Sequence, residues 1–240
     1  MQNIVEGFKS QYAKEQESEL SLEEYLNLAK RDPMAYASPA ERMLAAIGEP
    51  EIVDTRNDPR LSRLFSNRTI RRYPAFQEFY GMEDVIGQIV AFFKHAAKGL
   101  EERKQIIYLL GPVGGGKSSI AERLKALMES YPIYALKGSP VNETPLGLFH
   151  PERFGDTLEK EYGIPRRYLS GIMSPWAVKR LKEFDGDISQ FRVVRLNPSV
   201  LRQVAIAKTE PGDENNQDIS SLVGKVDIRK LDRHSQDDPD

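Results

Sequence analysis

A glycine-rich stretch near the middle of the chain has the sequence Gly111-Pro112-Val113-Gly114-Gly115-Gly116-Lys117-Ser118. It satisfies the pattern G-x-x-x-x-G-K-[S/T] in full, which is typical of loops that bind nucleotide phosphates. Glycine lets the backbone come close to phosphate oxygens, because a Cβ atom would collide with them or forbid the required φ angles. We therefore predict that this loop binds ATP.

The last residues of the loop predict that the nucleotide is bound together with Mg²⁺. Lys117 is expected to reach the β- and γ-phosphates, and the Ser118 hydroxyl is expected to bind the metal ion. Backbone N–H groups of the loop and of the helix that follows should point at the anion, with Ser119 at the edge of the site. The predicted phosphate-binding residues are Gly111, Pro112, Val113, Gly114, Gly115, Gly116, Lys117, Ser118 and Ser119.

The residues around the loop predict an α/β domain. Residues 106–110 are apolar and partly β-branched, which is typical of a buried parallel strand. Apolar residues recur at helical spacing before this run, over 82–97, and after the loop, over 120–128. A second strand is predicted over 132–136. The order helix, strand, loop, helix, strand predicts a doubly wound P-loop NTPase core over residues 76–240.

Residues 1–75 predict a helical segment that precedes this core. Helical spacing is present over 4–12 and 22–29, whereas 51–60 is irregular.

Two helix starts within this segment carry capping-box patterns, in which a serine is followed three residues later by a glutamate. Ser21 with Glu24 forms the first, and Ser38 with Glu41 forms the second. Gly48 stands where a helix C-cap is expected.

The turn before the long helix contains Tyr80 and Gly81. These residues either cover the adenine ring or form a hydrophobic staple and helix cap, and the sequence leaves both interpretations open.

Three arginines, Arg68, Arg71 and Arg72, form a small basic cluster before this turn. The cluster is interpreted as a solvated surface, with contact to phosphate or to a neighbouring subunit as alternatives.

The motifs that would identify a complete catalytic site are missing. No run of four apolar residues followed by Asp-Glu or Asp-Asp occurs after residue 118, and Asp227 is the nearest candidate for the acidic Walker B residue. Residues 204–208 resemble the lysine strand of eukaryotic-type kinases with one residue too many, and the H-R-D and D-F-G motifs are absent. We interpret 204–208 as a core strand, and catalytic residues cannot be assigned.

Composition restricts the class of protein. The chain has 240 residues, no cysteine, and 34 basic against 36 acidic residues. The resulting net charge of −2 argues against a general nucleic-acid-binding protein. The N-terminus has no signal-peptide pattern and no apolar run is long enough to cross a bilayer, so we expect a cytoplasmic protein.

Several stretches together resemble the bacterial PrkA serine protein kinases. The resemblance extends over essentially the whole chain, and it is most distinctive in the later stretches. The stretches that carry it are 67–74, 79–84, 109–119, 135–143 and 208–218.

This resemblance implies an AAA+-type domain that binds ATP and Mg²⁺, with Tyr80 and Gly81 near the adenine. It implies an ATP-dependent serine protein kinase whose protein substrate is unknown and whose AAA+ module assembles into homo-oligomers. It also implies that the acidic strand and the kinase-like domain lie beyond Asp240, so that the core is incomplete at its C-terminus. The alternative is an AAA+ ATPase that remodels partner proteins or helps to degrade them, and the plainest alternative is a nucleotide-binding fragment without activity of its own.

Overall fold

The structure, a computed structural model, describes residues 6–7 and 18–206. The chain divides into two compact units, and the first combines residues 1–36 with residues 132–240. The second unit is the continuous stretch 37–131, which contains the glycine-rich loop. The expected boundary at residue 75 falls inside this second unit, and the division into 1–75 and 76–240 stays a prediction.

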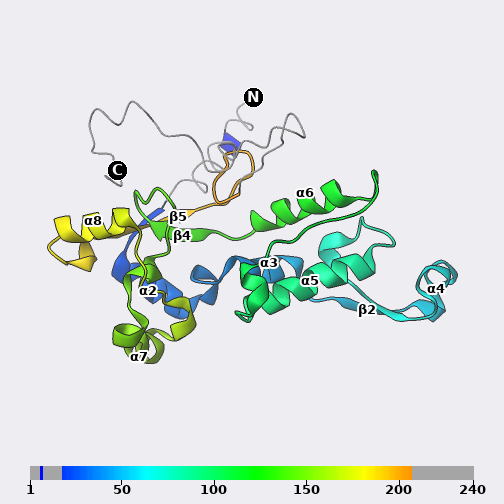
Figure 1. Ribbon diagram of the computed structural model, residues 1–240, viewed down its shortest axis with the longest axis horizontal. Helices are drawn as coiled ribbons and strands as arrows, with labels where there is room; N and C mark the ends of the chain where they lie inside the picture. Colours follow the sequence, from blue (N-terminus) through cyan, green and yellow to red (C-terminus); the bar gives the residue numbers. More distant parts are fainter. Residues whose placement is uncertain (1–5, 8–17, 207–240) are drawn as a thin grey trace. The chain divides into compact units, whose positions relative to one another are not determined.

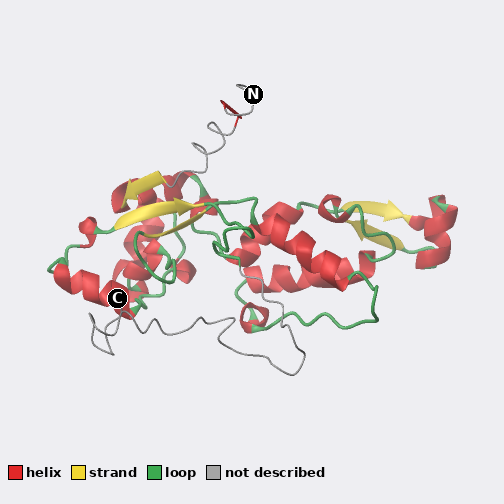
Figure 2. Cartoon of the chain, turned by 90° about the horizontal axis from the view of Figure 1, so that it is seen from above, coloured by secondary structure: helices red, strands yellow, loops and turns green. Residues whose placement is uncertain are grey.

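The first unit is built on a three-stranded antiparallel sheet with the strand order β1-β5-β4. Glu19 is paired with Val194 across β1 and β5, and Ala135 is paired with the same residue across β4 and β5. Figure 2 shows these strands as arrows with helices beside them. The elements are β1 (Ser18–Ser21), α2 (Leu22–Arg31), β4 (Ile133–Leu136), α7 (Pro151–Tyr162), α8 (Pro175–Glu183) and β5 (Arg192–Leu196), with short 3-10 helices at Pro33–Ala35, Pro145–Leu148, Arg166–Tyr168 and Ile188–Gln190.

Both faces of this sheet carry buried apolar side chains because successive residues of a strand point to opposite faces. Val193 and Leu136 belong to the larger cluster, which includes Tyr25 of α2 and Trp176 of α8. Val194 belongs to a smaller cluster on its own side. The helices therefore bury one face of the sheet, and Val204 packs on the cluster at the other.

The second unit is a group of helices with a β-hairpin. Helix α3 packs on both α5 and α6, and Figure 1 shows α3 and α5 side by side. Their shared core includes Met43, Ile47, Ile86, Val90 and Leu127. The elements are α3 (Pro39–Ile47), β2 (Glu51–Asp54), α4 (Pro59–Phe65), β3 (Thr69–Arg72), α5 (Glu83–Ala97) and α6 (Lys117–Met128), with 3-10 helices at Thr55–Asn57, Pro74–Phe76 and Glu101–Lys104.

The helix signals of the N-terminal segment are confirmed in both units. The Ser21 and Ser38 hydroxyls accept from the N–H groups of Glu24 and Glu41, and each glutamate accepts from the N–H of its serine. Gly48 is the C-cap of α3 with φ +77°. The helical spacing predicted over 4–12 lies outside the described residues, apart from residues 6 and 7.

The predicted strand at 106–110 is wrong in the structure. No described residue pairs with it, and Ile106, Tyr108 and Leu110 are 91%, 79% and 80% exposed. Residues 107 and 109 are half-buried, so the segment shows the alternation of a strand without its hydrogen-bond ladder. The expected parallel sheet is also corrected, because all the strand pairs among the described residues are antiparallel.

Two further expectations about strands are corrected. Residues 51–60 are not irregular, because Glu51–Asp54 forms β2 and Asp58 caps α4 through the N–H groups of Arg60 and Leu61. In the predicted strand 204–208, Val204 makes only an isolated bridge to Ser199, and residues from 207 onward lie outside the described part.

None of the helices within the described residues combines the length and the hydropathy that a bilayer crossing requires.

Candidate phosphate-binding site

The glycine-rich loop joins the extended segment 106–110 to the start of α6. Gly114 and Gly116 have φ +79° and +76°, a region that residues with a Cβ rarely adopt. Gly116 is the N-cap of α6 and provides no side-chain cap for the helix. The first N–H groups of α6 therefore keep their hydrogen-bonding capacity for another acceptor, and the helix dipole favours an anion there.

Lys117 folds back over the loop in this structure. Its Nζ donates to the carbonyl oxygen of Gly111 at 2.8 Å and to that of Pro112 at 2.5 Å. Pro112 also accepts from the Gly115 N–H at 3.2 Å. The ammonium group thus closes the loop on itself and lies among the residues predicted to bind phosphate.

Ser118 and Ser119 are exposed on the first turn of α6. A hydroxyl at position 118 fits a magnesium site that takes its remaining ligands from phosphate oxygens and water. No cluster of three or more His, Cys, Asp or Glu residues that could hold a metal ion occurs among the described residues. The candidate acidic residue Asp227 lies outside that part of the chain. The assignment of Ser118 to Mg²⁺ stays a prediction.

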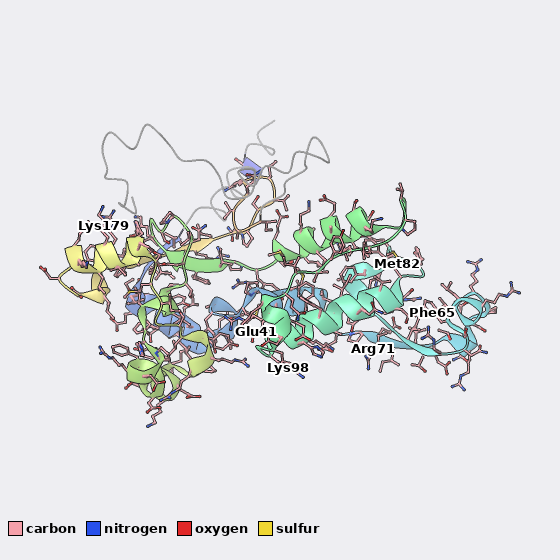
Figure 3. All side chains as sticks on the ribbon, viewed as in Figure 1. Glu41, Phe65, Arg71, Met82, Lys98 and Lys179 are labelled. Carbon is pink, nitrogen blue, oxygen red and sulfur yellow. The ribbon has the colours of Figure 1, made fainter. Side chains whose placement is uncertain are left out.

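The turn at Tyr80 and Gly81 approaches the loop through the next residue, Met82. A Cβ atom built on Gly116 would lie 3.0 Å from the Met82 Sδ atom, so the thioether lies against the loop. Figure 3 labels Met82 at the start of α5. Tyr80 itself is 85% exposed, and Gly81 has φ +77° with space for a Cβ limited by Leu64. The contact of Tyr80 and Gly81 with adenine stays a prediction.

Two cavities border the loop within this unit. One of about 560 Å³ lies against Phe79, Met82, Gly116, Ser119 and Arg123. The other, of about 580 Å³, lies between α5 and residues 105–112 and includes Lys117. Both volumes fall in the range of roughly 300–1,000 Å³ that is usual for small-molecule sites. A nucleotide at the loop would therefore have space on either side of it.

Arg123 is a residue of this region that the sequence motifs do not indicate. Its Nε donates to the carbonyl oxygen of Ala75 at 2.6 Å, and it lies 3.9 Å from a Glu78 carboxylate oxygen. The bond fixes α6 to the segment that precedes the Tyr80 turn. Since the two residues are 48 positions apart, no local sequence signal could have revealed this contact.

The predicted basic cluster is not a single site. Arg68 pairs with Asp84 at 2.8 Å, which ties the residue before β3 to the start of α5. Arg71 is exposed on β3 opposite Ile52, and Arg72 is half-buried opposite Glu51. Figure 1 shows the hairpin leading to α4. The arginines therefore belong to the hairpin rather than to the phosphate loop.

Comparison with known proteins identifies the family. Residues 20–240 match the family model described as the PrkA AAA domain. The chain is 64% identical over 99% of its length to "Serine/threonine kinase YeaG" of Escherichia coli strain K12, and it covers 38% of that protein. It is 34% identical over 90% of its length to "ATP-dependent protease PrkA" of Bacillus subtilis strain 168, and it covers 33% of that protein.

No solved structure matches the chain. The chain spans 38% and 33% of the lengths of these two relatives. The family match and the identity to both relatives confirm the resemblance to the PrkA proteins that the sequence motifs indicated, and they show an AAA-type domain of mixed helix and strand content. The chain therefore belongs to the PrkA family, and its residues 20–240 form the AAA domain of that family.

Proposed function

We propose that this chain is the ATP-binding AAA module of a PrkA-type serine protein kinase, which transfers a phosphoryl group from ATP to protein serine. The observation that carries the proposal is the complete phosphate loop at 111–118, followed by an α6 N-terminus without a side-chain cap. The relative of 64% identity is named a serine/threonine kinase, which supports kinase activity for the longer polypeptide.

In this proposal the loop binds the triphosphate through its backbone and through one side chain. The N–H groups of residues 114–119 donate to phosphate oxygens, because the glycines leave the backbone accessible. Lys117 exchanges its two carbonyl partners for β- and γ-phosphate oxygens. Ser118 binds Mg²⁺ through its hydroxyl, and the ion neutralises charge on the phosphates when bound.

A second function is favoured by the other relative, whose name is "ATP-dependent protease PrkA". In that case ATP hydrolysis by the AAA module would drive remodelling or degradation of partner proteins, and the modules would assemble into homo-oligomers. Both functions use the same ATP site and take place in the cytoplasm. They differ in the product, which is phosphoserine on a protein in the first case and cleaved peptide bonds in the second.

The ATP site is tested by calorimetric titration of ATP·Mg²⁺ into the chain and into Lys117→Ala. Loss of a charge-assisted hydrogen bond of ~1.5–3 kcal/mol predicts that affinity weakens about ten- to a hundred-fold. The matched control is Lys98→Ala, which removes the same charge from an exposed position at the C-terminal end of α5 (Figure 3).

Circular dichroism verifies that each variant is folded before titration. A folded wild-type chain that binds no ATP, or equal weakening in Lys117→Ala and Lys98→Ala, would overturn the assignment of the loop. In the longer polypeptide, ATP-dependent peptide cleavage without any phosphoserine would replace the first function by the second.

A further inference from the structure

A small basic and aromatic pocket lies in the first unit, between α8 and the strands β4 and β5. Its volume is about 230 Å³. Besides Gln190, it is lined by three basic side chains and three aromatic ones, namely Lys137, Arg180, Arg192, Trp176, Phe184 and Phe191. No acidic side chain belongs to this lining. The pocket therefore places positive charge next to aromatic side chains.

The aromatic rings form the closed side of the pocket. Trp176 and Phe191 are buried, and the ring of Phe184 meets that of Phe191 edge-on with centroids 5.1 Å apart. The Arg180 guanidinium lies 5.8 Å from the centroid of the Trp176 ring, within the range of a cation–π contact. The rings meet edge to face and provide an apolar wall that also positions one of the cations.

The turn after β4 brings Lys137 close to this wall. Gly138 follows it with φ +83°, and a Cβ atom there would lie 3.3 Å from the Trp176 ring. The Lys137 N–H also donates to the Arg192 carbonyl oxygen at 2.8 Å, so the two cationic residues are neighbours on adjacent chain segments.

A carboxylate of the chain already lies between two of the cations. Glu19 on β1 places Oε2 2.5 Å from the Lys137 Nζ atom and Oε1 4.0 Å from the Arg192 Nε atom. All three side chains are about half exposed, and exposed ion pairs of this kind add little to stability. Glu19 therefore marks where an anion is held, and a ligand of higher charge could displace it.

The third cation, Arg180, pairs with Glu183 at 2.5 Å on the outer side of α8. The pKa of Glu24 is lowered mainly by hydrogen bonds from Ser21 and also by the charge of Arg192. The Glu24 carboxylate accepts from the Ser21 N–H at 2.7 Å and so acts as a helix cap. The two acids that pair with the lining cations are therefore both on exposed side chains, and a phosphate dianion in place of the Glu19 carboxylate would bring a second negative charge to Lys137 and Arg192.

The size of the pocket restricts the ligand. A volume of about 230 Å³ is below the roughly 300–1,000 Å³ of sites for drug-sized molecules, so the pocket fits a single side chain rather than a nucleotide. We propose that it binds a phosphomonoester carried on an aromatic side chain of a partner peptide, with the phosphate on Lys137 and Arg192 and the ring against Phe184, the partly exposed aromatic residue of the lining.

Calorimetric titration with phenyl phosphate tests this proposal. The titration is made in the Lys117→Ala background, which weakens phosphate binding at the glycine-rich loop, and all variants are compared within that background, so that the result does not depend on ATP binding. Arg192→Gln should weaken binding at least about tenfold, because it removes a charge-assisted contact. Lys182→Gln is the matched control, since it removes an exposed charge from α8 outside the pocket.

The Glu19→Gln variant separates a ligand site from a structural ion pair. If a phosphate displaces the Glu19 carboxylate, this variant should bind phenyl phosphate several-fold more tightly than its parent. Glu161→Gln on α7 changes the net charge equally and should leave binding unchanged. Equal effects of the two variants, or no effect of Arg192→Gln, would overturn the proposal.

Further ligands identify the source of the phosphate. A phosphotyrosine peptide should bind at least as tightly as phenyl phosphate, whereas inorganic phosphate and the unphosphorylated peptide should bind more weakly. Tighter binding of inorganic phosphate would show that the rings play no part. Binding of phenyl phosphate without binding of the phosphopeptide would rule out a peptide partner.

Discussion

Substitution of Gly116 by alanine tests whether the conformation of the phosphate loop depends on glycine. Gly116 has φ +76°, and a residue with a Cβ atom in the left-handed region costs roughly 1–2 kcal/mol. The added Cβ would also lie 3.0 Å from the Met82 Sδ atom and 3.3 Å from its Cε atom. Because a thioether side chain is flexible, Met82 can move by a few tenths of an ångström, and most of the cost comes from the backbone.

The matched control is Gly87→Ala on α5. Gly87 lies inside a helix, and apart from the backbone of that helix no atom lies within 4 Å of its Cβ position. Alanine in a helix interior is more stable than glycine by roughly 0.5–1 kcal/mol. The two variants add the same methyl group to the same unit and are expected to change the free energy of unfolding in opposite directions.

Urea denaturation measures this difference, and titration of ATP·Mg²⁺ measures its consequence for binding. Gly116→Ala should lower both the stability and the ATP affinity, whereas Gly87→Ala should raise the stability and leave the affinity unchanged. If Gly116→Ala were as stable as the wild type and bound ATP equally well, the loop would not require its left-handed residue, and the reasoning would be refuted.

Two further predictions concern other parts of this unit. Ser38→Ala removes the hydroxyl that accepts from the Glu41 N–H at 3.3 Å, and urea denaturation should show a free energy of unfolding lower by about 1 kcal/mol. The pKa of Asp54 is lowered from its ordinary value of 3.8 by hydrogen bonds from the Arg56 side chain and backbone. This carboxylate therefore stabilises the fold above pH 3.8 and loses its effect as the pH falls through the lowered pKa. Such groups titrate in the acid range of about pH 5 to pH 2. Over this range, thermal denaturation should show that the melting temperature falls more steeply for the wild type than for Asp54→Asn.

Helix ends were predictable from the sequence because their signals are local. The Ser38 hydroxyl and the Glu41 carboxylate each accept from the other residue's N–H within one turn, so four residues of sequence contain the whole interaction. The C-cap at Gly48, with φ +77°, needs only the glycine itself. Such features depend on neighbours along the chain, and the structure confirms them.

Strands were less predictable because a strand is defined by its partner. Residues 106–110 have the composition and the alternation of a strand, but no described segment pairs with them. In contrast, Ser18–Ser21 is polar and short, and it becomes a strand through its pairing with Arg192–Arg195. Apolar composition thus indicated extended backbone. The hydrogen-bond ladder depended instead on residues that lie 171 to 177 positions apart in the sequence, from Ser21↔Arg192 to Ser18↔Arg195.

The candidate site shows the same division between local and distant contacts. The loop and its lysine follow from eight consecutive residues. The structure alone places Met82 and Arg123 beside the loop. Met82 precedes α5 and lies against Gly116, and Arg123 on α6 is held by its bond to the Ala75 carbonyl oxygen. A motif therefore locates the phosphate-binding atoms, and the packing of α3, α5 and α6 determines what surrounds them.

The two contacts of Lys117 affect how its substitution should be interpreted. An ammonium group has three donors, and in this structure two of them are used by the carbonyl oxygens of Gly111 and Pro112. ATP binding through Lys117 must exchange these bonds for bonds to phosphate, so the net gain is smaller than the phosphate contact alone. The Lys117→Ala variant lacks the lysine–phosphate contact, but it also has no carbonyl bonds to break when ATP binds. The measured weakening is therefore a lower bound on the strength of the lysine–phosphate interaction, and a value near the lower end of the expected range is consistent with direct contact.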